Sequence, residues 1–532
     1  MKVKKFLSLF ISLAFLFALL NGCSSGDDSN QKESTGISES ASTPEGSGEA
    51  LSGFCVGYAQ TDITPSGSVS LTGFGDADER FSSRTTEPLY ATCIAVRDDA
   101  GDTVIIVAYD LINCAEVWSV PVRNAIAEKT GIPVDHIMLH SSHTHSGPDI
   151  AKMPPYQNEV LQKTVDTAVA ALADMSPATM SGSFTRVQEK VSCVRHYLLT
   201  DGTYMGEGVG AVPKADLVGH TRQPDNLLQM VKFNREGKKD IVMMNWQAHY
   251  LGSKLDYYAI TSDYPGVARA TVENALDCHS IFILGASGNL NSWSQFPDEL
   301  DVTYHTELGQ LLGEKIIEMD AEQKPLRADD VRVIAVSRPT PTKNDPNISE
   351  EIPLYAISFG DLAMFFAPYE MFDISAMEVR DHSPFTMTFC ASCSNAARSY
   401  IPTPECWDWE EKYEVRITRY EKGTAENLVN EFVDMLNKLA AEGELPAEKG
   451  DGYLTPEFTP TTDGITYYNL TPGVTANTKE VENGFYQLCL YQDGTKMKIM
   501  LAKDQATAEA VLQLETMQLI FDEQNVIIGI VS

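Results

Sequence analysis

Short apolar runs alternate with longer helical patterns along most of the chain, and this alternation limits the possible folds more than any other feature. The strand-like runs include TVIIVAYDLI, HIMLHS, KDIVMMNWQ, SIFILG and LAMFFAP, and the helical stretches include EVLQKTVDTAVAALADM and HTELGQLLGEKIIEMDAE. Such alternation favours a mixed α/β (α+β) domain built on a partly buried sheet. We expect this domain to cover residues 54–442, because the helical stretch TAENLVNEFVDMLNKLAAEGE closes the pattern.

A second, smaller domain is expected at the C-terminus. The stretch LPAEKGDGYLTPEFTPTTDG is rich in Pro, Gly and Thr and is typical of a linker or irregular boundary. Residues 455–532 then predict a small α+β domain with a hairpin around Asp493-Gly494, a helix over residues 507–521 and a last strand, NVIIGIVS.

The overall composition is that of a globular protein. With 532 residues, 43% of them hydrophobic, the chain is long enough for two or three packed domains. Its 40 basic and 74 acidic residues give a net charge of -34, which argues against a nucleic-acid partner, since phosphate contacts need clusters of Lys and Arg.

The N-terminus predicts export. Lysines precede an apolar run that ends near Leu20, which is typical of a signal peptide over residues 1–22. The ending LNGC resembles a bacterial lipobox, which implies that Cys23 is acylated and holds the protein on the extracytoplasmic face of a membrane. The alternative is a plain secreted protein with an incidental cysteine. Residues 23–53 lack large apolar side chains and predict a flexible tether.

Nine cysteines remain after Cys23, an odd number without regular spacing, so they do not indicate a disulfide framework. Cys390 and Cys393 form a lone Cys-x-x-Cys. With no second pair, structural thiols, free or locally paired, are favoured over a zinc site.

The stretch DHIMLHSSHTHSGPD, residues 135–149, holds four of the ten histidines. On extended geometry the Cα atoms of His143 and His145 would lie about 6.5 to 7 Å apart on the same side of a strand, so the two imidazoles could share one Zn²⁺. Such pairs also occur without any metal. His136 and His140, in or before the strand, are interpreted as structural.

A zinc site needs further ligands. His249 ends the apolar run MMNWQAH, and its alternative interpretation is a core histidine satisfied by the backbone. Glu370 ends the run MFFAPYE and is either a solvated strand end or a carboxylate with a buried partner such as a metal.

Together these motifs resemble the neutral/alkaline (non-lysosomal) ceramidase family. The resemblance covers roughly residues 54–435 and rests on short motifs in the family's order: DITP at 62–65, HTHSGP at 143–148, NWQAH at 245–249, SDYPG at 262–266, GASGNLN at 285–291, YIPT at 400–403 and YEV at 413–415.

The resemblance implies a zinc centre at strand ends. It makes His143, His145 and His249 zinc ligands, although AHYLGS departs from the family's usual continuation after the third histidine. It further implies that Glu370 and Tyr400 complete the centre. In the family, the positions of Tyr413 and Arg195 contact the substrate amide, and the match for Arg195 rests on fewer residues.

The pattern breaks at the family's nucleophile. Asn291 occupies the position of the nucleophilic serine, and asparagine cannot form an acyl-enzyme. Either Ser287 or Ser292 could replace that serine only with a shifted backbone. The compatible chemistry is therefore zinc-activated water, with Asn291 orienting the water or donating to the oxyanion.

The general base is open, and Asp110 and Asp149 are candidates with structural roles as their alternatives. The family's C-terminal domain is a β-sandwich, which a helix over residues 507–521 would not fit.

We therefore expect a zinc-dependent hydrolase of an amide bond, N-acyl or sphingolipid-like, or of a related carbonyl bond in a small-molecule or lipid substrate. The alternatives are a non-catalytic, surface-anchored binding protein and a ceramidase that uses a substitute serine.

Overall fold

The computed structural model describes most of the chain between residues 52 and 455, together with shorter C-terminal segments. The described residues are 52–75, 79–199, 204–206, 217–249, 257–294, 300–302, 304–409, 413–443, 446–455, 465–468, 474–480, 486–492, 495–502, 506–507, 517–521 and 526–531. The expected signal peptide, Cys23 and nearly all of the expected tether lie outside them.

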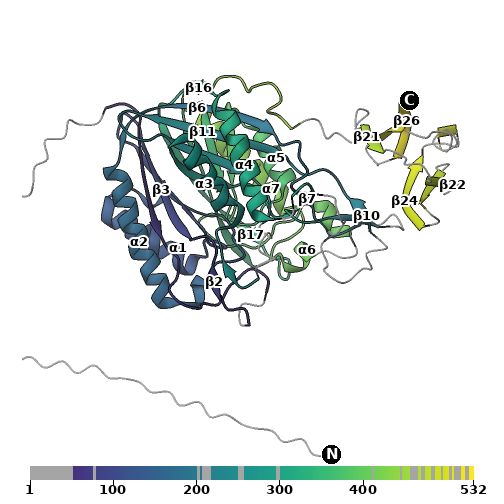
Figure 1. Cartoon of the computed structure of the whole chain (residues 1–532), viewed down its shortest axis with the longest axis horizontal. Helices are drawn as coiled ribbons and strands as arrows, with labels where there is room; N and C mark the ends of the chain where they lie inside the picture. The colour runs from purple at the N-terminus through teal and green to yellow at the C-terminus, as the bar shows by residue number, and fades with distance from the viewer. Residues whose placement is uncertain are drawn as a thin grey trace, which may run out of the picture. The chain divides into compact units, whose positions relative to one another are not determined.

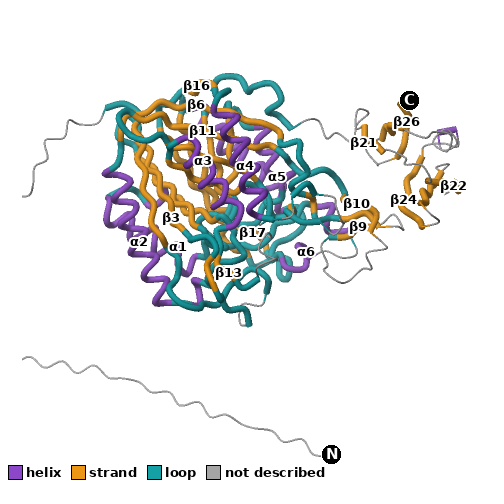
Figure 2. The backbone as a smooth tube through the Cα atoms, in the orientation of Figure 1, coloured by secondary structure: helices purple, strands orange, loops and turns teal. Residues whose placement is uncertain are grey.

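A nine-stranded mixed sheet forms the centre of the main domain (Figures 1 and 2). Its strand order is β14-β12-β11-β6-β1-β3-β4-β5, with β16 paired to β6. Two neighbouring pairs, β4 with β5 and β12 with β14, are parallel. The strands are β1 (Cys55–Asp62), β3 (Tyr90–Arg97), β4 (Thr103–Tyr109), β5 (Ile137–Ser141), β6 (Ser176–Arg186), β11 (Leu227–Arg235), β12 (Ile241–Trp246), β14 (His279–Leu284) and β16 (Lys324–Leu326).

A four-stranded sheet packs on one face of the large sheet. Its strands, in the order β17 (Val331–Pro341), β18 (Ser349–Phe359), β19 (Leu362–Phe366) and β20 (Met387–Ala391), are antiparallel except for the parallel pair β19 and β20. One core cluster joins the two sheets, with Ile106 and Met243 from the first and Met364 and Phe389 from the second.

Helices cover the outer faces of both sheets (Figure 1). On the large sheet these are α1 (Glu116–Thr130), α2 (Pro154–Ala173), α3 (Asp263–Leu276) and α4 (His305–Asp320), and on the smaller sheet α5 (Asp373–His382) and α7 (Thr424–Ala441). The strands are therefore buried on both faces. In β4, Ile106 faces the other sheet while Ile105 and Val107 face the helices, which explains why such strands are continuous apolar runs. The expected mixed α/β architecture is confirmed.

Short elements connect these layers. They are β2 (Arg84–Thr85) with β13 (Ala259–Ile260), β7 (Cys193–Val194) with β15 (Leu290–Asn291), the sheet of β8 (Tyr197–Leu199), β9 (Tyr204–Met205) and β10 (Leu217–His220), the 3-10 turns η1 (Val134–His136), η2 (Ile150–Lys152) and η5 (Pro404–Asp408), and α6 (Tyr413–Ile417).

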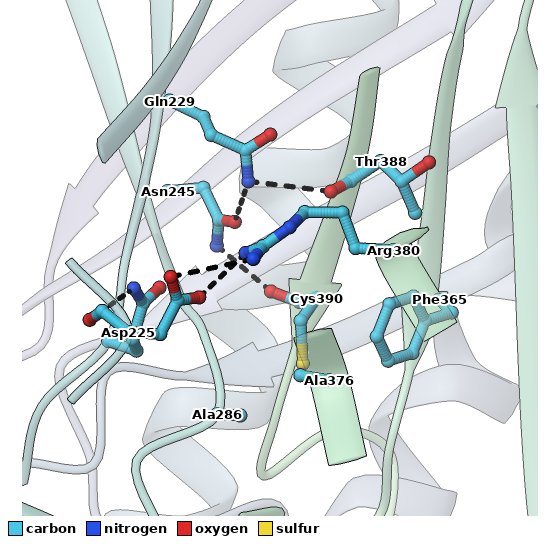
Figure 3. Close-up of a pocket in the computed structure, with 10 residues that line it drawn as sticks. Asp225, Gln229, Asn245, Ala286, Phe365, Ala376, Arg380, Thr388 and Cys390 are labelled. Atoms are coloured by element: carbon cyan, nitrogen blue, oxygen red, sulfur yellow. Dashed lines mark hydrogen bonds and ion pairs between the residues drawn. The ribbon is translucent and has the colours of Figure 1, made fainter. Parts of the chain in front are cut away.

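A polar network between the two sheets surrounds a cavity of about 10 Å³, room for one water molecule (Figure 3). Arg380 Nη1 donates to Asp225 Oδ2 at 2.6 Å, and Asn245 Nδ2 donates to the carbonyl oxygen of Cys390 at 2.9 Å. Gln247 Nε2 donates to the carbonyl oxygen of Asp225. The bond from Asn245 fixes β12 against β20, and the bond from Gln247 ties the residue after β12 to the loop before β11, so Asn245 and Gln247 of the NWQAH motif have structural roles.

The C-terminal residues form a six-stranded sheet in the order β21-β25-β26-β24-β23-β22. Its strands are β21 (Ile465–Tyr468), β22 (Val474–Glu480), β23 (Tyr486–Gln492), β24 (Thr495–Ala502), β25 (Met517–Phe521) and β26 (Val526–Val531). β23 and β24 pair antiparallel with Gln492 opposite Thr495, so the predicted hairpin is confirmed, as is the last strand.

The predicted helix over residues 507–521 is wrong for its last five residues. Met517–Phe521 is a strand that pairs with both β21 and β26, because two neighbouring strands satisfy its backbone better than a helical end would. Residues 508–516 lie outside the described part of the chain. The strand at Met517–Phe521 is compatible with the β-sandwich that the family has in this domain, unlike the expected helix.

No helix within the described ranges is both long and apolar enough to cross a membrane.

Candidate metal centre

Three histidine side chains converge at the carboxyl ends of β5 and β12. The Nε2 atoms of His145 and His249 each lie 3.1 Å from His143 Nε2. All three side chains are buried, and their nitrogens lie within 4.8 Å of one another, so this cluster could hold a metal ion.

The local backbone that carries His143 and His145 is a loop and not the extended strand expected from the spacing. β5 ends at Ser141, and His143 adopts a left-handed conformation with φ 63°. Thr144 Oγ1 donates to the carbonyl oxygen of Thr261, which ties the loop to the SDYPG motif. The left-handed turn, not the alternation of a strand, brings the two imidazoles to one point.

Hydrogen bonds at the opposite ring nitrogens orient two of the imidazoles. His143 Nδ1 lies 2.7 Å from the carbonyl oxygen of Ile112, and His249 Nδ1 lies 2.7 Å from that of Ser287. A carbonyl oxygen can only accept, so each Nδ1 carries the proton, and in a neutral ring Nε2 then presents a lone pair. Burial, together with Arg195, lowers the pKa of His249 to about 4, which keeps that ring neutral.

Glu370 adds a carboxylate at the same point. Its Oε2 lies 3.1 Å from His249 Nε2 and 3.4 Å from His143 Nε2. Burial would raise the pKa of Glu370, but the neighbouring His143 and His249 hold it well below its usual range. Burial would likewise lower the pKa of His143, but Cys393 and Glu370 raise it well above its usual range.

A buried carboxylate surrounded by imidazole lone pairs requires a positive charge, either a proton on His143 or a metal ion. Three imidazole nitrogens and one carboxylate oxygen are also a ligand set that Zn²⁺ takes in proteins. The residues present therefore fit a metal ion.

Tyr400 lies beside this cluster. Its hydroxyl is 3.5 Å from His249 Nε2, and its backbone bridges in parallel to that of Glu370. Burial raises the pKa of Tyr400 well above its usual range, so the phenol carries its proton in the absence of a cation. The structure thus brings together all five residues expected as ligands.

Arg195 lies below two tyrosine rings. Its guanidinium carbon is 5.2 Å from the centroid of Tyr400 and 5.6 Å from that of Tyr413. Its Nη2 donates to the carbonyl oxygen of Gly288 at 2.6 Å, and its Nε donates to Glu414 Oε1 at 2.9 Å.

Asn291 is held next to His249 by a parallel backbone bridge. Its side chain is fully buried, and neither Oδ1 nor Nδ2 has a hydrogen-bond partner among the residues that the structure describes. Leaving both amide atoms unpaired in a protein interior is unfavourable, which points to a ligand or water as their partner.

The two alternative serines differ in their contacts. Ser292 Oγ donates to the carbonyl oxygen of His249 at 3.0 Å. Ser287 Oγ is buried and has no hydrogen-bond partner within the described part of the chain.

Several other candidates have structural roles. His140 Nε2 accepts from the backbone N–H of Leu284, and burial lowers the pKa of His140 to about 3. Asp110 forms a buried ion pair with Arg269 at 2.6 Å, so it is not placed as a base. Asp149 pairs with Lys152 at 3.3 Å. His136 Nδ1 contacts the carbonyl oxygen of Thr103.

Cys390 and Cys393 are both free and buried, as expected for structural thiols. Cys393 Sγ nevertheless lies 3.7 Å from His143 Nδ1, behind the ligand ring, a contact that the sequence did not indicate.

Two glycines approach the centre closely: Gly288, which belongs to the GASGNLN motif, and Gly73, which lies outside the motifs. A Cβ on Gly288 would lie 2.3 Å from the carbonyl oxygen of Glu370, and a Cβ on Gly73 would lie 2.5 Å from Cβ of His145. Arg80 also supports the loop, since its Nη1 donates to the carbonyl oxygen of His145 while its guanidinium stacks between Phe74 and Tyr257.

Comparison with solved structures identifies the fold. No protein-family model and no curated protein matches the chain. Among solved structures, neutral ceramidase from Pseudomonas aeruginosa is similar with a TM-score of 0.59 and 15% identity, over 83% of this chain and 84% of that one. A ceramidase complexed with C2 is similar with a TM-score of 0.60 and 16% identity, over 82% and 84% of the two chains. At this identity the likeness concerns the fold, and the chain therefore has the fold of neutral ceramidase.

Proposed function

We propose that this protein is a zinc-dependent hydrolase that cleaves an amide bond, N-acyl or sphingolipid-like, or a related carbonyl bond. The observation that carries the proposal is the convergence of His143, His145, His249 and Glu370 on one buried point that requires a positive charge. The ceramidase fold supports the choice of carbonyl substrates.

Bound zinc would supply a Lewis acid that activates water for attack on a carbonyl carbon. The histidines and Glu370 would hold the ion, with Tyr400 beside it. Their second contacts, such as that of His249 Nδ1 with the carbonyl oxygen of Ser287, fix the orientation of the rings.

The chain's own polar groups would stabilise the reacting carbonyl. Asn291 has a buried amide without a partner in the described residues, so its Nδ2 can donate to the developing oxyanion or its Oδ1 can orient water. A well-placed donor of this kind contributes about 3 kcal/mol to transition-state stabilisation. Tyr413 would contact the substrate from its place against Tyr400, and Arg195 would supply positive charge beneath both rings.

The test of this function is hydrolysis of a panel of N-acyl substrates, including ceramides of several chain lengths and N-acyl amino acids. We expect turnover of at least one member, its loss after chelation, and its return with added Zn²⁺. Turnover that survives complete chelation would contradict the proposal.

We further propose that the protein acts on the extracytoplasmic face of a membrane, anchored through acylated Cys23. The support is the sequence alone, a signal-peptide pattern that ends in LNGC. The Cys23→Ala protein should move from the membrane fraction to the soluble extracytoplasmic fraction, and unchanged membrane association would argue against the anchor.

A non-catalytic binding protein is the second candidate, and Asn291 favours it because the family's nucleophilic serine is missing. Zinc-dependent turnover of any substrate in the panel rules it out. Binding of a panel member without turnover would support it instead.

A ceramidase that uses a substitute serine is the third candidate. Ser287 has the hydroxyl without a described partner, whereas that of Ser292 is engaged. Unaltered hydrolysis by the Ser287→Ala and Ser292→Ala proteins would exclude both serines as nucleophiles.

A further inference from the structure

Glu414 is not among the proposed metal ligands or catalytic residues. It nevertheless contacts Arg195, which lies under the rings of Tyr400 and Tyr413. It lies on α6, directly after Tyr413, and its side chain is 1% exposed. Its Oε1 accepts from Arg195 Nε at 2.9 Å and lies 3.7 Å from His196 Nε2. A fully buried carboxylate is costly unless it is paired, so this pair is a built feature of the site.

Arg195 connects Glu414 to the metal centre through three contacts. Its guanidinium lies under the rings of Tyr400 and Tyr413. Its Nη2 donates to the carbonyl oxygen of Gly288. The backbone N–H of Gly288 in turn donates to the carbonyl oxygen of Met371, the residue after Glu370. Its backbone N–H donates to the carbonyl oxygen of Asn289, at the start of the segment that carries Asn291.

This arrangement places a buried positive charge close to ligands that must accept a cation. The Arg195 guanidinium carbon lies 5.2 Å from the centroid of the Tyr400 ring, and the hydroxyl of that ring lies 3.5 Å from His249 Nε2. An unpaired guanidinium there would repel a bound cation, since charges interact strongly where water is excluded. Glu414 is the carboxylate whose contact with Arg195 balances that charge.

We propose that Glu414 is a positioning residue of the metal centre: it fixes Arg195 and neutralises its charge, so that the guanidinium supports Tyr400 and Tyr413 without weakening metal binding. This inference rests on the proposed function, whose site it deepens.

The experiment measures the zinc affinity of the full-length protein by competition with a chromophoric chelator. The Glu414→Gln protein keeps an acceptor for Arg195 but loses the charge, and we expect its zinc affinity to fall by about tenfold, the lower range for residues that support ligands. The Glu414→Asp protein keeps the charge, and its affinity should stay within about threefold of the wild type.

The double substitution Arg195→Met with Glu414→Gln removes both charges. Replacing a whole buried pair is usually tolerated, so the double variant should fold, and it should bind zinc within about threefold of the wild type. Its kcat should nevertheless fall more than its KM changes, because the tyrosines lose their support. If Glu414 only stabilised the fold, removing the side chain of Arg195 as well would not restore zinc affinity.

Asp225→Asn is the matched control, because the carboxylate of Asp225 also pairs with a buried arginine, Arg380, which is not among the residues proposed for the metal centre. It should lower the urea midpoint and leave zinc affinity unchanged. Wild-type zinc affinity in Glu414→Gln, or no recovery in the double variant, would overturn this inference alone. Absence of zinc binding by the wild type would instead overturn the proposed function and the inference with it.

Discussion

His143 and His249 show how single side chains define the metal centre. Each donates Nδ1–H to a backbone carbonyl, so each turns an Nε2 lone pair toward the same point, where Glu370 brings a negative charge. The lone pairs and the carboxylate are balanced only when a cation lies among them. We therefore expect each ligand to be necessary for tight binding of the metal ion.

Replacing His145 with alanine should lower the amount of bound zinc, because the centre loses one of its three nitrogen donors and only two imidazoles and one carboxylate remain to hold the ion. Metal content after gel filtration is the measurement. His136→Gln is the control, since His136 contacts Thr103 and not the cluster, and it should keep the zinc content of the wild type. Equal zinc in the His145→Ala and wild-type proteins would remove His145 from the ligand set.

Asn291 tests the catalytic part of the proposal. The Asn291→Ala protein should bind zinc normally while its kcat falls by about 10²-fold, because Asn291 Nδ2, which is buried and has no partner among the described residues, would donate to the reacting carbonyl and would not bind the metal. Steady-state kinetics on the best substrate of the panel measure this. Asn347→Ala, on an exposed loop, controls for loss of an asparagine. A parallel loss of zinc would show that Asn291 supports the metal instead.

The sequence predicted which residues form the site, but it did not predict the backbone geometry that brings them together. The His-x-His spacing suggested an extended strand, whereas His143 lies in a left-handed turn, a conformation that spacing alone does not reveal for a residue other than glycine. The contacts of Glu414 and Cys393 could not be predicted, because both depend on segments that meet only in the folded chain.

The turn that follows β14 shows how an element shapes the centre. Gly288 lies so close to the backbone of Glu370 that any side chain would displace one of the two segments. The glycine in GASGNLN therefore allows the loop after β14 and the loop after β19 to meet.

The Gly288→Ala protein should lose about 1–3 kcal/mol of unfolding free energy and bind zinc more weakly, because its Cβ pushes against the carbonyl oxygen of Glu370. Urea unfolding and chelator competition measure the two effects. Gly219→Ala is the control, since no atom lies within 4 Å of its Cβ position. If Gly288→Ala and Gly219→Ala have the same unfolding free energy and the same zinc affinity, the close approach of Gly288 to Glu370 is not required for the site.

Element prediction succeeded where burial on two faces produced long apolar runs, as in β4 and β19. It failed at Met517–Phe521, where pairing with β21 and β26 outweighs a helical pattern. The pairing with β21 joins residues 49 (Tyr468 with Met517) to 55 (Ile465 with Ile520) positions apart, a separation that local periodicity does not contain.

At the scale of the whole molecule, the metal centre brings together side chains from segments that are distant in the sequence. Its ligands follow β5 and β12 of the large sheet and β19 of the smaller sheet, and the hydrogen bond from Asn245 to the carbonyl oxygen of Cys390 links the same two sheets. A metal bound only by the folded chain stabilises that chain.

Zinc should therefore raise the unfolding free energy of the full-length protein by about 2.7 kcal/mol when free zinc is 100 times its dissociation constant. Urea unfolding at fixed free zinc, with and without chelator, measures the gain. The His145→Ala protein should lack it. An equal gain in that variant would place the stabilising zinc elsewhere in the chain.

The most direct measurement is X-ray absorption at the zinc edge of the purified protein, combined with its zinc content. We predict about one zinc per chain with nitrogen and oxygen neighbours at about 2.0–2.2 Å and no sulfur, as three histidines and Glu370 require. Absence of zinc, or a sulfur neighbour at about 2.3 Å from a thiolate such as that of Cys393, would contradict the proposed centre.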